Sequence, residues 1–276
     1  MEKRHLDAIL ESLGTVLSEK EMAMLPRRYE LVGDIMLLHL PESLMRHSKE
    51  IALAYMDAVG VVSVMGKQAI SGEYRRPSHT LLAGTRTVAV HRENGISYEL
   101  DLSKLMFSSG NINERIRMSR VHDVGPVVDM FAGIGYFTLP LAKHAGCHVV
   151  ALEKNPVSYG YLCRNVVRNG VEGLVETVHT DCRDYCGHAM RIMMGYVGTT
   201  DMFLPKAFEM ADDGCIVHFH NTVPSDTFKA HMEHQIRTRA DAEEGVDVCI
   251  LGSHVVKKYS PGIVHAVTDF LVEKST

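Results

Sequence analysis

Residues 127–138 read Val-Val-Asp-Met-Phe-Ala-Gly-Ile-Gly-Tyr-Phe-Thr, and this stretch decides the fold. Val127–Met130 forms a short, mostly apolar and β-branched run, which is typical of a buried parallel strand. Gly133 and Gly135 let the backbone turn sharply, and they let a ligand approach where a Cβ atom would block it. Tyr136–Ala145 then has helical spacing, so the stretch predicts a strand, a glycine-rich turn and a helix.

A second apolar run, His148–Leu152, predicts the next strand, and Glu153 follows it directly. A carboxylate at that point can accept two hydrogen bonds from a ribose diol. A tight strand–helix turn without a ligand is the alternative, because Gly-x-Gly motifs are common. The two acids, Asp129 on the first strand and Glu153 after the second, favour a nucleotide-like cofactor at the edge of a parallel sheet.

Two classes of cofactor compete for such a turn. A dinucleotide site requires a third glycine, but this chain has Thr138 there and no glycine before Gly146. Asp129 would also repel a pyrophosphate. The stretch resembles instead the cofactor motif of class I S-adenosylmethionine-dependent transferases, whose cofactor carries an ammonium and a sulfonium but no phosphate. A nearby carboxylate such as Asp129 favours that cofactor.

Composition sets limits on the class of protein. The chain has 276 residues, of which 46% are hydrophobic and 23% charged, as expected for one large globular domain or two small ones. The formal charge of −5 excludes a global basic surface, so any contact with nucleic acid must come from a local patch. Met1–Leu13 lacks the apolar core of a signal peptide, and no run is long enough to cross a membrane. The six cysteines lack paired zinc spacing, so we expect a reduced, cytoplasmic protein without a metal.

The pattern of elements predicts an α/β protein: a Rossmann-like sheet of the class I S-adenosylmethionine-dependent transferase type with an antiparallel edge, plus a small N-terminal α+β domain. We expect the N-terminal domain at 1–72, a hairpin and linker segment at 73–124, and the cofactor-binding catalytic domain at 125–276. The predicted elements include a strand over Glu30–Leu40, a helix capped by Ser43 that runs to about Ala58, a hairpin closed by Asn94-Gly95, and a closing strand pair at Asp247–Lys258 and Val264–Glu273.

Asp181 and Cys182 follow the third strand of the nucleotide-binding half. In a doubly wound sheet that point lies beside the ligand crevice, where an adenine would sit. Asp181 can accept a hydrogen bond from the adenine amino group, and Cys182 can offer its backbone amide. Asp181 is equally suited to cap the helix that begins there, and the two interpretations stay open.

The fourth strand ends in Met193-Met194-Gly195-Tyr196-Val197-Gly198-Thr199. Amino-group methyltransferases of this fold usually carry Asn-Pro-Pro-Tyr or Asp-Pro-Pro-Tyr at this place, and the chain has neither. Tyr196 can stack on a base, or it can simply be a core tyrosine. Upstream, a group of basic residues can neutralise RNA phosphates or form a solvated face; its members are Arg75, Arg76, Arg86, Arg92, Lys104, Arg115, Arg117 and Arg120.

The segment from Tyr74 to Pro156 resembles one family. The pieces that carry the resemblance are Tyr74-Arg75-Arg76-Pro77, Leu82-Ala83-Gly84, His91-Arg92-Glu93-Asn94-Gly95, Lys104-Leu105-Met106-Phe107-Ser108-Ser109-Gly110-Asn111, Glu114-Arg115-Ile116-Arg117, Asp129–Phe137 and Glu153-Lys154-Asn155-Pro156. They are similar to the archaeal branch of the tRNA guanine methyltransferase and wybutosine-synthesising transferase group, which modifies the guanosine just 3′ of the anticodon.

Two departures distinguish the branches. The methyltransferases carry Asn-Pro-Arg where this chain has Phe107–Asn111, and an Asn-Leu-Pro type motif where it has Met194-Gly195-Tyr196. Both departures match the aminocarboxypropyl transferase branch, as do Thr199-Thr200 and His218-Phe219-His220. The resemblance implies transfer of the 3-amino-3-carboxypropyl group of S-adenosyl-L-methionine to a ring carbon of 4-demethylwyosine in tRNA(Phe), with release of methylthioadenosine.

The resemblance also implies the site. Ser108 and Arg115 hold the methionine end of the cofactor so that Cγ faces the base, and Tyr196 completes the catalytic residues. The cofactor-binding residues are expected to be Ser108, Arg115, Asp129, Phe131, Gly133, Gly135, Tyr136, Phe137, Glu153, Asp181 and Cys182. A guanine-N1 methyltransferase on the same nucleoside, and an RNA-binding module without turnover, are the alternatives.

Overall fold

A computed structural model describes residues 1–68, 70–71, 76–122 and 125–275. The chain divides into two compact units, Met1–Phe107 and Ser108–Thr276, which are described separately. The predicted domain boundaries at 72/73 and 124/125 fall on residues outside those described, and so does part of the segment Tyr74-Arg75-Arg76-Pro77. Among the described residues, no helix combines the length and apolar character that a membrane span requires.

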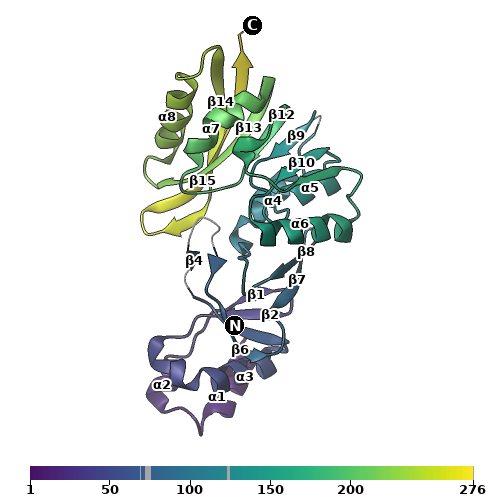
Figure 1. Cartoon of the computed structure of the whole chain (residues 1–276). Coiled ribbons are helices and arrows are strands. Elements are labelled where there is room, and N and C mark those ends of the chain that lie inside the picture. Colours follow the sequence, from purple (N-terminus) through teal and green to yellow (C-terminus); the bar gives the residue numbers. More distant parts are fainter. Residues whose placement is uncertain (69, 72–75, 123–124, 276) are drawn as a thin grey trace. The chain divides into compact units, whose positions relative to one another are not determined.

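The first unit packs helices against a small mixed sheet (Figure 1). Its apolar core joins helix α1 and helix α3 to strands β2, β3 and β6. Strand β2 runs parallel to β3, and the other neighbours in the order β1-β2-β3-β6 are antiparallel. The bounds are α1 Lys3–Leu13, α2 Glu19–Ala23, β1 Glu30–Val32, β2 Ile35–Leu38, η1 Glu42–His47, α3 Ser48–Val59, β3 Ser63–Gly66, β4 Ile70–Ser71, β5 Arg76–Pro77, β6 Thr80–Gly84, β7 Val88–Glu93 and β8 Ile96–Asp101.

Two predictions for the first unit were wrong. The strand predicted over Glu30–Leu40 is a hairpin, because Gly33 adopts φ +60° and a Cβ atom there would lie 2.5 Å from the Val90 carbonyl oxygen. The helix predicted to begin after Ser43 starts as a 3-10 turn, and α3 itself begins at Ser48 with His47 as its N-cap. Ser43 donates its hydroxyl to the Met24 sulfur instead of capping.

The Asn-Gly hairpin prediction is confirmed. Strand β7 pairs antiparallel with β8, and the turn between them is Asn94-Gly95. Asn94 has φ +45° and Gly95 has φ +72°, the two positive values that a tight type I′ hairpin requires.

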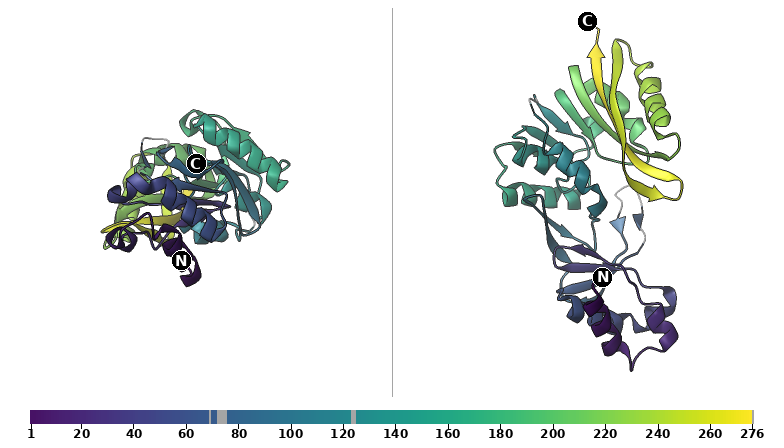
Figure 2. Two further views of the ribbon diagram at one scale, coloured as in Figure 1. Left: turned by 90° about the horizontal axis from the view of Figure 1, so that it is seen from below. Right: turned by 180° about the vertical axis from the view of Figure 1, so that it is seen from behind.

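The second unit is built on one seven-stranded sheet with the order β11-β10-β9-β12-β13-β15-β14. Strands β9 to β13 are parallel, and β15 is antiparallel to both of its neighbours, which confirms the Rossmann-like sheet with an antiparallel edge. The long strands β13, β15 and β14 lie side by side in every view (Figure 2). The strands are β9 Val127–Asp129, β10 Val149–Leu152, β11 Val175–Val178, β12 Ala189–Met194, β13 Ala211–Pro224, β14 Val246–Ser260 and β15 Ile263–Lys274.

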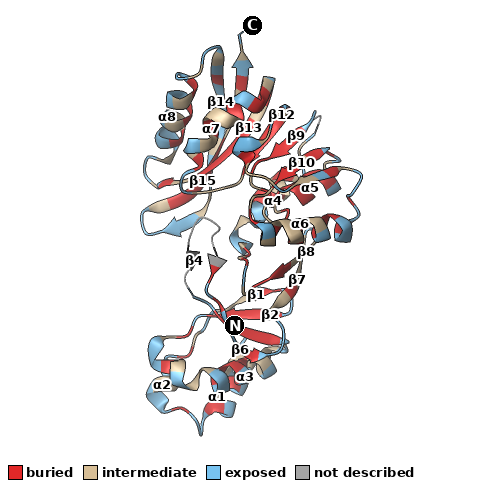
Figure 3. Cartoon of the chain, viewed as in Figure 1, coloured by how far each residue is buried: buried red, intermediate tan, exposed pale blue. Residues whose placement is uncertain are grey.

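Helices cover this sheet on both faces because alternate strand residues point to opposite sides. Val127 and Met193 pack with Met118 of α4 and Leu141 of α5. Their neighbours Val128 and Met194 pack in a separate cluster that includes α7 and α8. Figure 3 shows buried residues concentrated along the strands of this sheet. The helices are η2 Ser109–Asn111, α4 Ile112–Met118, α5 Thr138–Lys143, α6 Pro156–Asn169, η3 Cys182–Asp184, η4 Thr200–Phe203, α7 Leu204–Met210 and α8 Phe228–Ala240.

Candidate active site

The glycine-rich loop follows β9 directly and leads into α5. Gly133 has φ +59° and Gly135 has φ +100°, a region that side chains rarely adopt. A Cβ atom on Gly133 would lie 2.9 Å from the Tyr136 ring, and one on Gly135 would lie 2.8 Å from Leu139. Both positions therefore require glycine, and the loop packs tightly on its own side chains at the carboxyl end of the sheet.

Glu153 ties this loop to the end of β10. Its Oε2 accepts a hydrogen bond from the Gly133 backbone N–H at 2.7 Å, and its Oε1 accepts one from the Asn155 N–H at 2.6 Å. Burial raises the pKa of this carboxyl. Glu153 thus lies beside the glycine turn, at the place expected of a ribose-binding carboxylate.

Asp129 lies beneath the loop and is completely buried. It accepts hydrogen bonds from the Thr138 hydroxyl at 2.7 Å and from the Phe131 backbone N–H at 3.3 Å. Burial raises its pKa to about 6. Its side chain therefore braces both ends of the loop, and its predicted role next to the cofactor's positive charge stays a prediction.

Aromatic rings border the loop on the side of β12. Phe131 stacks on Tyr196 with 5.3 Å between ring centroids, and the edge of Phe203 meets Phe131 at 5.0 Å. Phe137 packs so closely on the following turn that a Cβ atom on Gly195 would lie 2.7 Å from its ring. Tyr196 is half-buried, so its ring has both packed and solvent-facing surface.

Asp181 caps the short helix η3 by accepting from the Arg183 backbone N–H at 3.0 Å. Hydrogen bonds from the Arg183 side chain hold the pKa of this carboxyl well below its usual range, and Lys154 Nζ lies 3.0 Å from it. The capping interpretation is therefore realised, while the adenine contact stays a prediction. The neighbouring Cys182 is buried, and this raises the pKa of its thiol to about 12.

Ser108 and Arg115, predicted to act together, lie together. Arg115 is 2% exposed, and its Nη1 donates to the Ser108 carbonyl oxygen at 3.0 Å. Lys257 of β14 donates from its ammonium to the Ser108 hydroxyl. Lys257 was missed by the sequence analysis because 149 residues separate it from Ser108.

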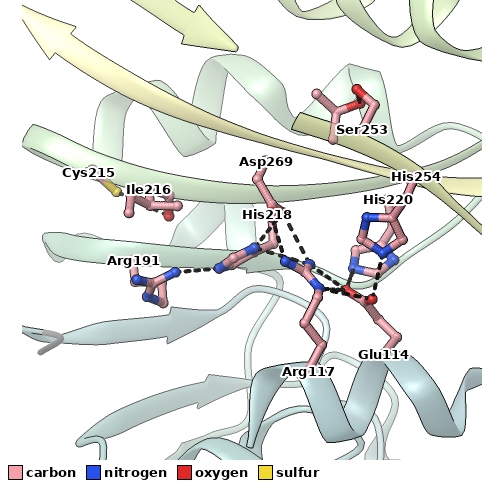
Figure 4. Close-up of polar contacts among 11 residues, drawn as sticks. Glu114, Arg117, Arg191, Cys215, Ile216, His218, His220, Ser253, His254 and Asp269 are labelled. Atoms are coloured by element: carbon pink, nitrogen blue, oxygen red, sulfur yellow. Dashed lines mark hydrogen bonds and ion pairs between the residues drawn. The ribbon is translucent and has the colours of Figure 1, made fainter. Parts of the chain in front are cut away.

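Helix α4, which carries Arg115, is held by a buried network of charged groups (Figure 4). Glu114 is 3% exposed and receives hydrogen bonds from Arg117, with Nε at 3.1 Å, and from His254 Nε2 at 3.1 Å. Burial alone would raise the pKa of Glu114, but these donors and His220 hold it well below its usual range. Arg117 also binds both carboxylate oxygens of Asp269 on β15.

His218 continues the network deeper into the sheet. Arg191 Nη1 lies 2.6 Å from His218 Nε2, and a guanidinium can only donate, so Nε2 is the acceptor. The ring proton is therefore on Nδ1, which donates to Asp269 Oδ1 at 2.6 Å. Burial lowers the pKa of His218, consistent with a neutral ring. A neutral histidine thus links the buried guanidinium of Arg191 to the half-buried carboxylate of Asp269.

His220, next on the same face of β13, lies between the network and the loop. Its ring is 5.2 Å from that of Phe137, its Nδ1 is 3.0 Å from His265 Nε2, and its Nε2 is 3.5 Å from Glu114 Oε1. Complete burial lowers its pKa to about 4. The described residues contain no group of three or more His, Cys, Asp or Glu side chains arranged to hold a metal.

The basic residues expected upstream are distributed over both units. Arg86 pairs with Asp34, Lys104 lies 3.5 Å from Asp101, and Arg117 is engaged by Glu114 and Asp269. Arg75 lies outside the described residues, and the side chain of Arg76 is not described. The part of this group in the second unit is Arg115, Arg117 and Arg120.

The sheet order and the glycine loop closed by an acid define a class I S-adenosylmethionine-dependent transferase. A family model described as the TRM5/TYW2 methyltransferase domain matches residues 89–249, and one described as the TYW2 N-terminal domain matches residues 9–87. The chain therefore belongs to the TRM5/TYW2 family.

Two relatives and one solved structure represent that family. The chain is 42% identical over 270 residues to the tRNA(Phe) (4-demethylwyosine(37)-C(7)) aminocarboxypropyltransferase of Pyrococcus horikoshii, covering 97% of both chains. It is 35% identical to the tRNA (guanine(37)-N(1))-methyltransferase Trm5b of Pyrococcus abyssi, covering 90% of this chain and 76% of that one. The crystal structure of P. horikoshii TYW2 in complex with MeSAdo matches with a TM-score of 0.89 at 39% identity, over 98% of this chain and 100% of that chain.

Proposed function

We propose that this chain transfers the 3-amino-3-carboxypropyl group of S-adenosyl-L-methionine to C7 of 4-demethylwyosine in tRNA(Phe), and that methylthioadenosine is released. The observation that carries the proposal is the 42% identity to an aminocarboxypropyltransferase along almost the whole of both chains. In the reaction a C7–Cγ bond forms, the Cγ–S bond breaks, and the C7 proton is released. Because the substrate is a tRNA, we expect the protein to act in the cytoplasm.

The residues around the loop fit this co-substrate. Gly133 and Gly135 form a tight turn that other residues would not fit, because a Cβ atom would meet Tyr136 or Leu139, and Glu153 lies where a ribose diol would bind. Phe131, Tyr136 and Phe137 supply apolar walls. Asp181 and the Cys182 backbone lie after β11, at the place where an adenine binds in sheets of this type.

Choice of the transferred carbon depends on how the methionine end is held, because the sulfonium activates three carbons alike. Arg115 suits the methionine carboxylate, since its guanidinium can bind both oxygens at once. Ser108 presents its hydroxyl from the same corner, oriented by Lys257. These residues hold Cγ towards the base and turn the methyl group away.

The acceptor base must leave the stacked anticodon region to reach this corner. Tyr196, half-buried against Phe131, offers a ring on which the extruded base can stack. The substrate partner is therefore the anticodon region of tRNA(Phe).

The proposal is tested by incubating the protein with tRNA(Phe) that carries 4-demethylwyosine and with S-adenosylmethionine labelled in either the carboxyl or the methyl group. Carboxyl label is expected in the tRNA, and methyl label is expected in methylthioadenosine. Transfer of the methyl label alone would instead establish the guanine-N1 methyltransferase activity of the second relative. Cofactor and tRNA binding without transfer of either label would leave only a binding module.

We predict that Glu153→Ala weakens the binding of S-adenosylmethionine by about fiftyfold, since the variant loses charge-assisted hydrogen bonds to the ribose and the anchor of the Gly133 turn. Isothermal titration calorimetry measures the change. Glu176→Ala, on the exposed side of β11, is the matched control and leaves affinity unchanged. An unchanged affinity for S-adenosylmethionine in Glu153→Ala would contradict the assignment of Glu153 to the cofactor site.

A further inference from the structure

The second unit contains a groove that the glycine loop and Glu153 do not line. Its volume is about 960 Å³, and it lies between helix α4 with the residues that follow it and the face of the sheet formed by β12 to β15. The cofactor residues of the loop, β10 and η3 are absent from its lining. The groove is therefore a separate feature of this unit.

The groove is basic although the chain is acidic. The guanidinium groups of Arg117, Arg120 and Arg191 line it, and Asp269 is the carboxylate that lines it. His122, His218 and His254 add imidazole rings. When Glu114, which pairs with Arg117, is counted with Asp269 against the three arginines, one positive charge remains in excess, whereas the whole chain carries −5. Such a local excess attracts anions despite the net charge of the protein.

Arg191 gives the floor of the groove an unusual donor. It is 8% exposed, its Nη1 donates to His218, and its Nε has no hydrogen-bond acceptor within the described parts of the chain. Burial lowers the pKa of this guanidinium, so the surroundings do not compensate its charge fully. A buried polar group without a partner is costly, and an anion in the groove would reduce that cost.

The groove adjoins the part of α4 that carries Arg115. Asn113 and His254 both line it; Asn113 precedes the Glu114-Arg115 pair on α4, and His254 contacts Glu114. From there it follows α4 to Arg120 and His122, both of which are exposed. A nucleotide strand whose modified base reaches the cofactor held by Arg115 would continue along this path, with its phosphates over the exposed guanidinium group of Arg120.

We infer that this groove binds backbone phosphates of the RNA on one side of the modified nucleotide; the inference rests on the proposed function. Phosphates are matched by arginine because the guanidinium donates in parallel to two oxygens. The contacts position the strand and read no sequence. Arg120 and His122 form the outer contacts, and Arg191 forms the floor.

Reversing the charge at Arg120 tests the inference, because its side chain is exposed and the change leaves the buried network intact. We expect Arg120→Glu to weaken the binding of a tRNA(Phe) transcript by about tenfold, and to reduce the slope of log affinity against log salt by about one. Fluorescence anisotropy over a series of KCl concentrations measures both. Arg237→Glu is the matched control, since that exposed arginine pairs with Glu233 on α8, on the opposite face of the sheet, and is expected to keep wild-type affinity and slope.

The outcomes separate this inference from the proposed function. Unchanged affinity and slope in Arg120→Glu would overturn the inference that the groove binds RNA phosphates, whether or not the wild type transfers the carboxyl label. A weakened Arg120→Glu would support the groove even if the wild type transferred no label. Titration with inorganic phosphate alone distinguishes the source of the anion. Loss of phosphate binding in Arg120→Glu with unchanged RNA binding would assign the groove to a small phosphate ligand and overturn the RNA inference.

Discussion

Arg115→Ala is expected to lower the rate of aminocarboxypropyl transfer about a thousandfold, while the affinity for methylthioadenosine falls less than about threefold. The reason is that methylthioadenosine lacks the methionine carboxylate that Arg115 is proposed to hold. Without the guanidinium the cofactor still docks through its adenosine, but its Cγ is no longer aimed at the base. Single-turnover transfer of the carboxyl label and calorimetry with methylthioadenosine give the two numbers.

A conservative variant tests whether charge or geometry matters at this position. Arg115→Lys keeps the positive charge but loses the fork, and we expect it to recover only part of the rate. Arg115 is 2% exposed, and local unfolding of α4 would also reduce transfer. Hydrogen exchange over α4 is therefore measured in each variant as a control, and it is expected to match the wild type. Equal losses of transfer and of methylthioadenosine binding would contradict a role at the methionine end.

Arg117→Met is expected to lower the free energy of unfolding of the second unit by about 3 kcal/mol. The substitution removes the cation that the buried Glu114 and the half-buried Asp269 share. Breaking such a pair from one side costs more than an exposed pair contributes, since among the described residues Glu114 keeps only histidine partners and Asp269 keeps only His218. Urea unfolding followed by circular dichroism, with hydrogen exchange over α4 and β15, measures and localises the loss.

The loss should depend on pH. Burial alone would raise the pKa of Asp269, but hydrogen bonds from His218 and Arg117 lower it from 3.8 to about 2. A carboxyl with a depressed pKa stabilises the fold above its unfolded value, and this contribution is lost as the pH falls towards its folded value. The difference between wild type and Arg117→Met should therefore shrink between about pH 4 and about pH 2. Arg237→Met, which removes an exposed pair, should cost under about 1 kcal/mol at any pH, and a pH-independent loss in Arg117→Met would contradict the ionic origin.

Local signals account for what the sequence predicted well. The glycine turn at Gly133 and the Asn94-Gly95 hairpin each depend on a few adjacent residues. Where the prediction was wrong, a local signal was overridden by a distant one. Gly33 breaks the strand predicted over Glu30–Leu40 with a turn at φ +60°, and the backbone of Val90 leaves no room for a Cβ atom there.

The contacts within the buried network could not be predicted from the sequence, for a physical reason. Its members come from α4, β12, β13, β14 and β15, and nothing in the residues next to each of them marks a partner. The alternation of His218 and His220 with apolar residues was the one available signal, and it indicated a strand without indicating Asp269 or Glu114. The joint role of Ser108 and Arg115 at the methionine end was predicted only through the resemblance to a family.

The attachment of α4 has a consequence for the order in which the protein matures. Arg117 meets Asp269 across 152 residues of chain, Ser108 meets Lys257 across 149, and Glu114 meets His254 across 140. During synthesis, the glycine loop and the first three parallel strands are made long before β14 and β15. A nascent chain can thus form its adenosine cradle early, but Arg115 gains its final orientation only when the last strand pairs. Competence for group transfer is therefore the last property that the growing chain acquires.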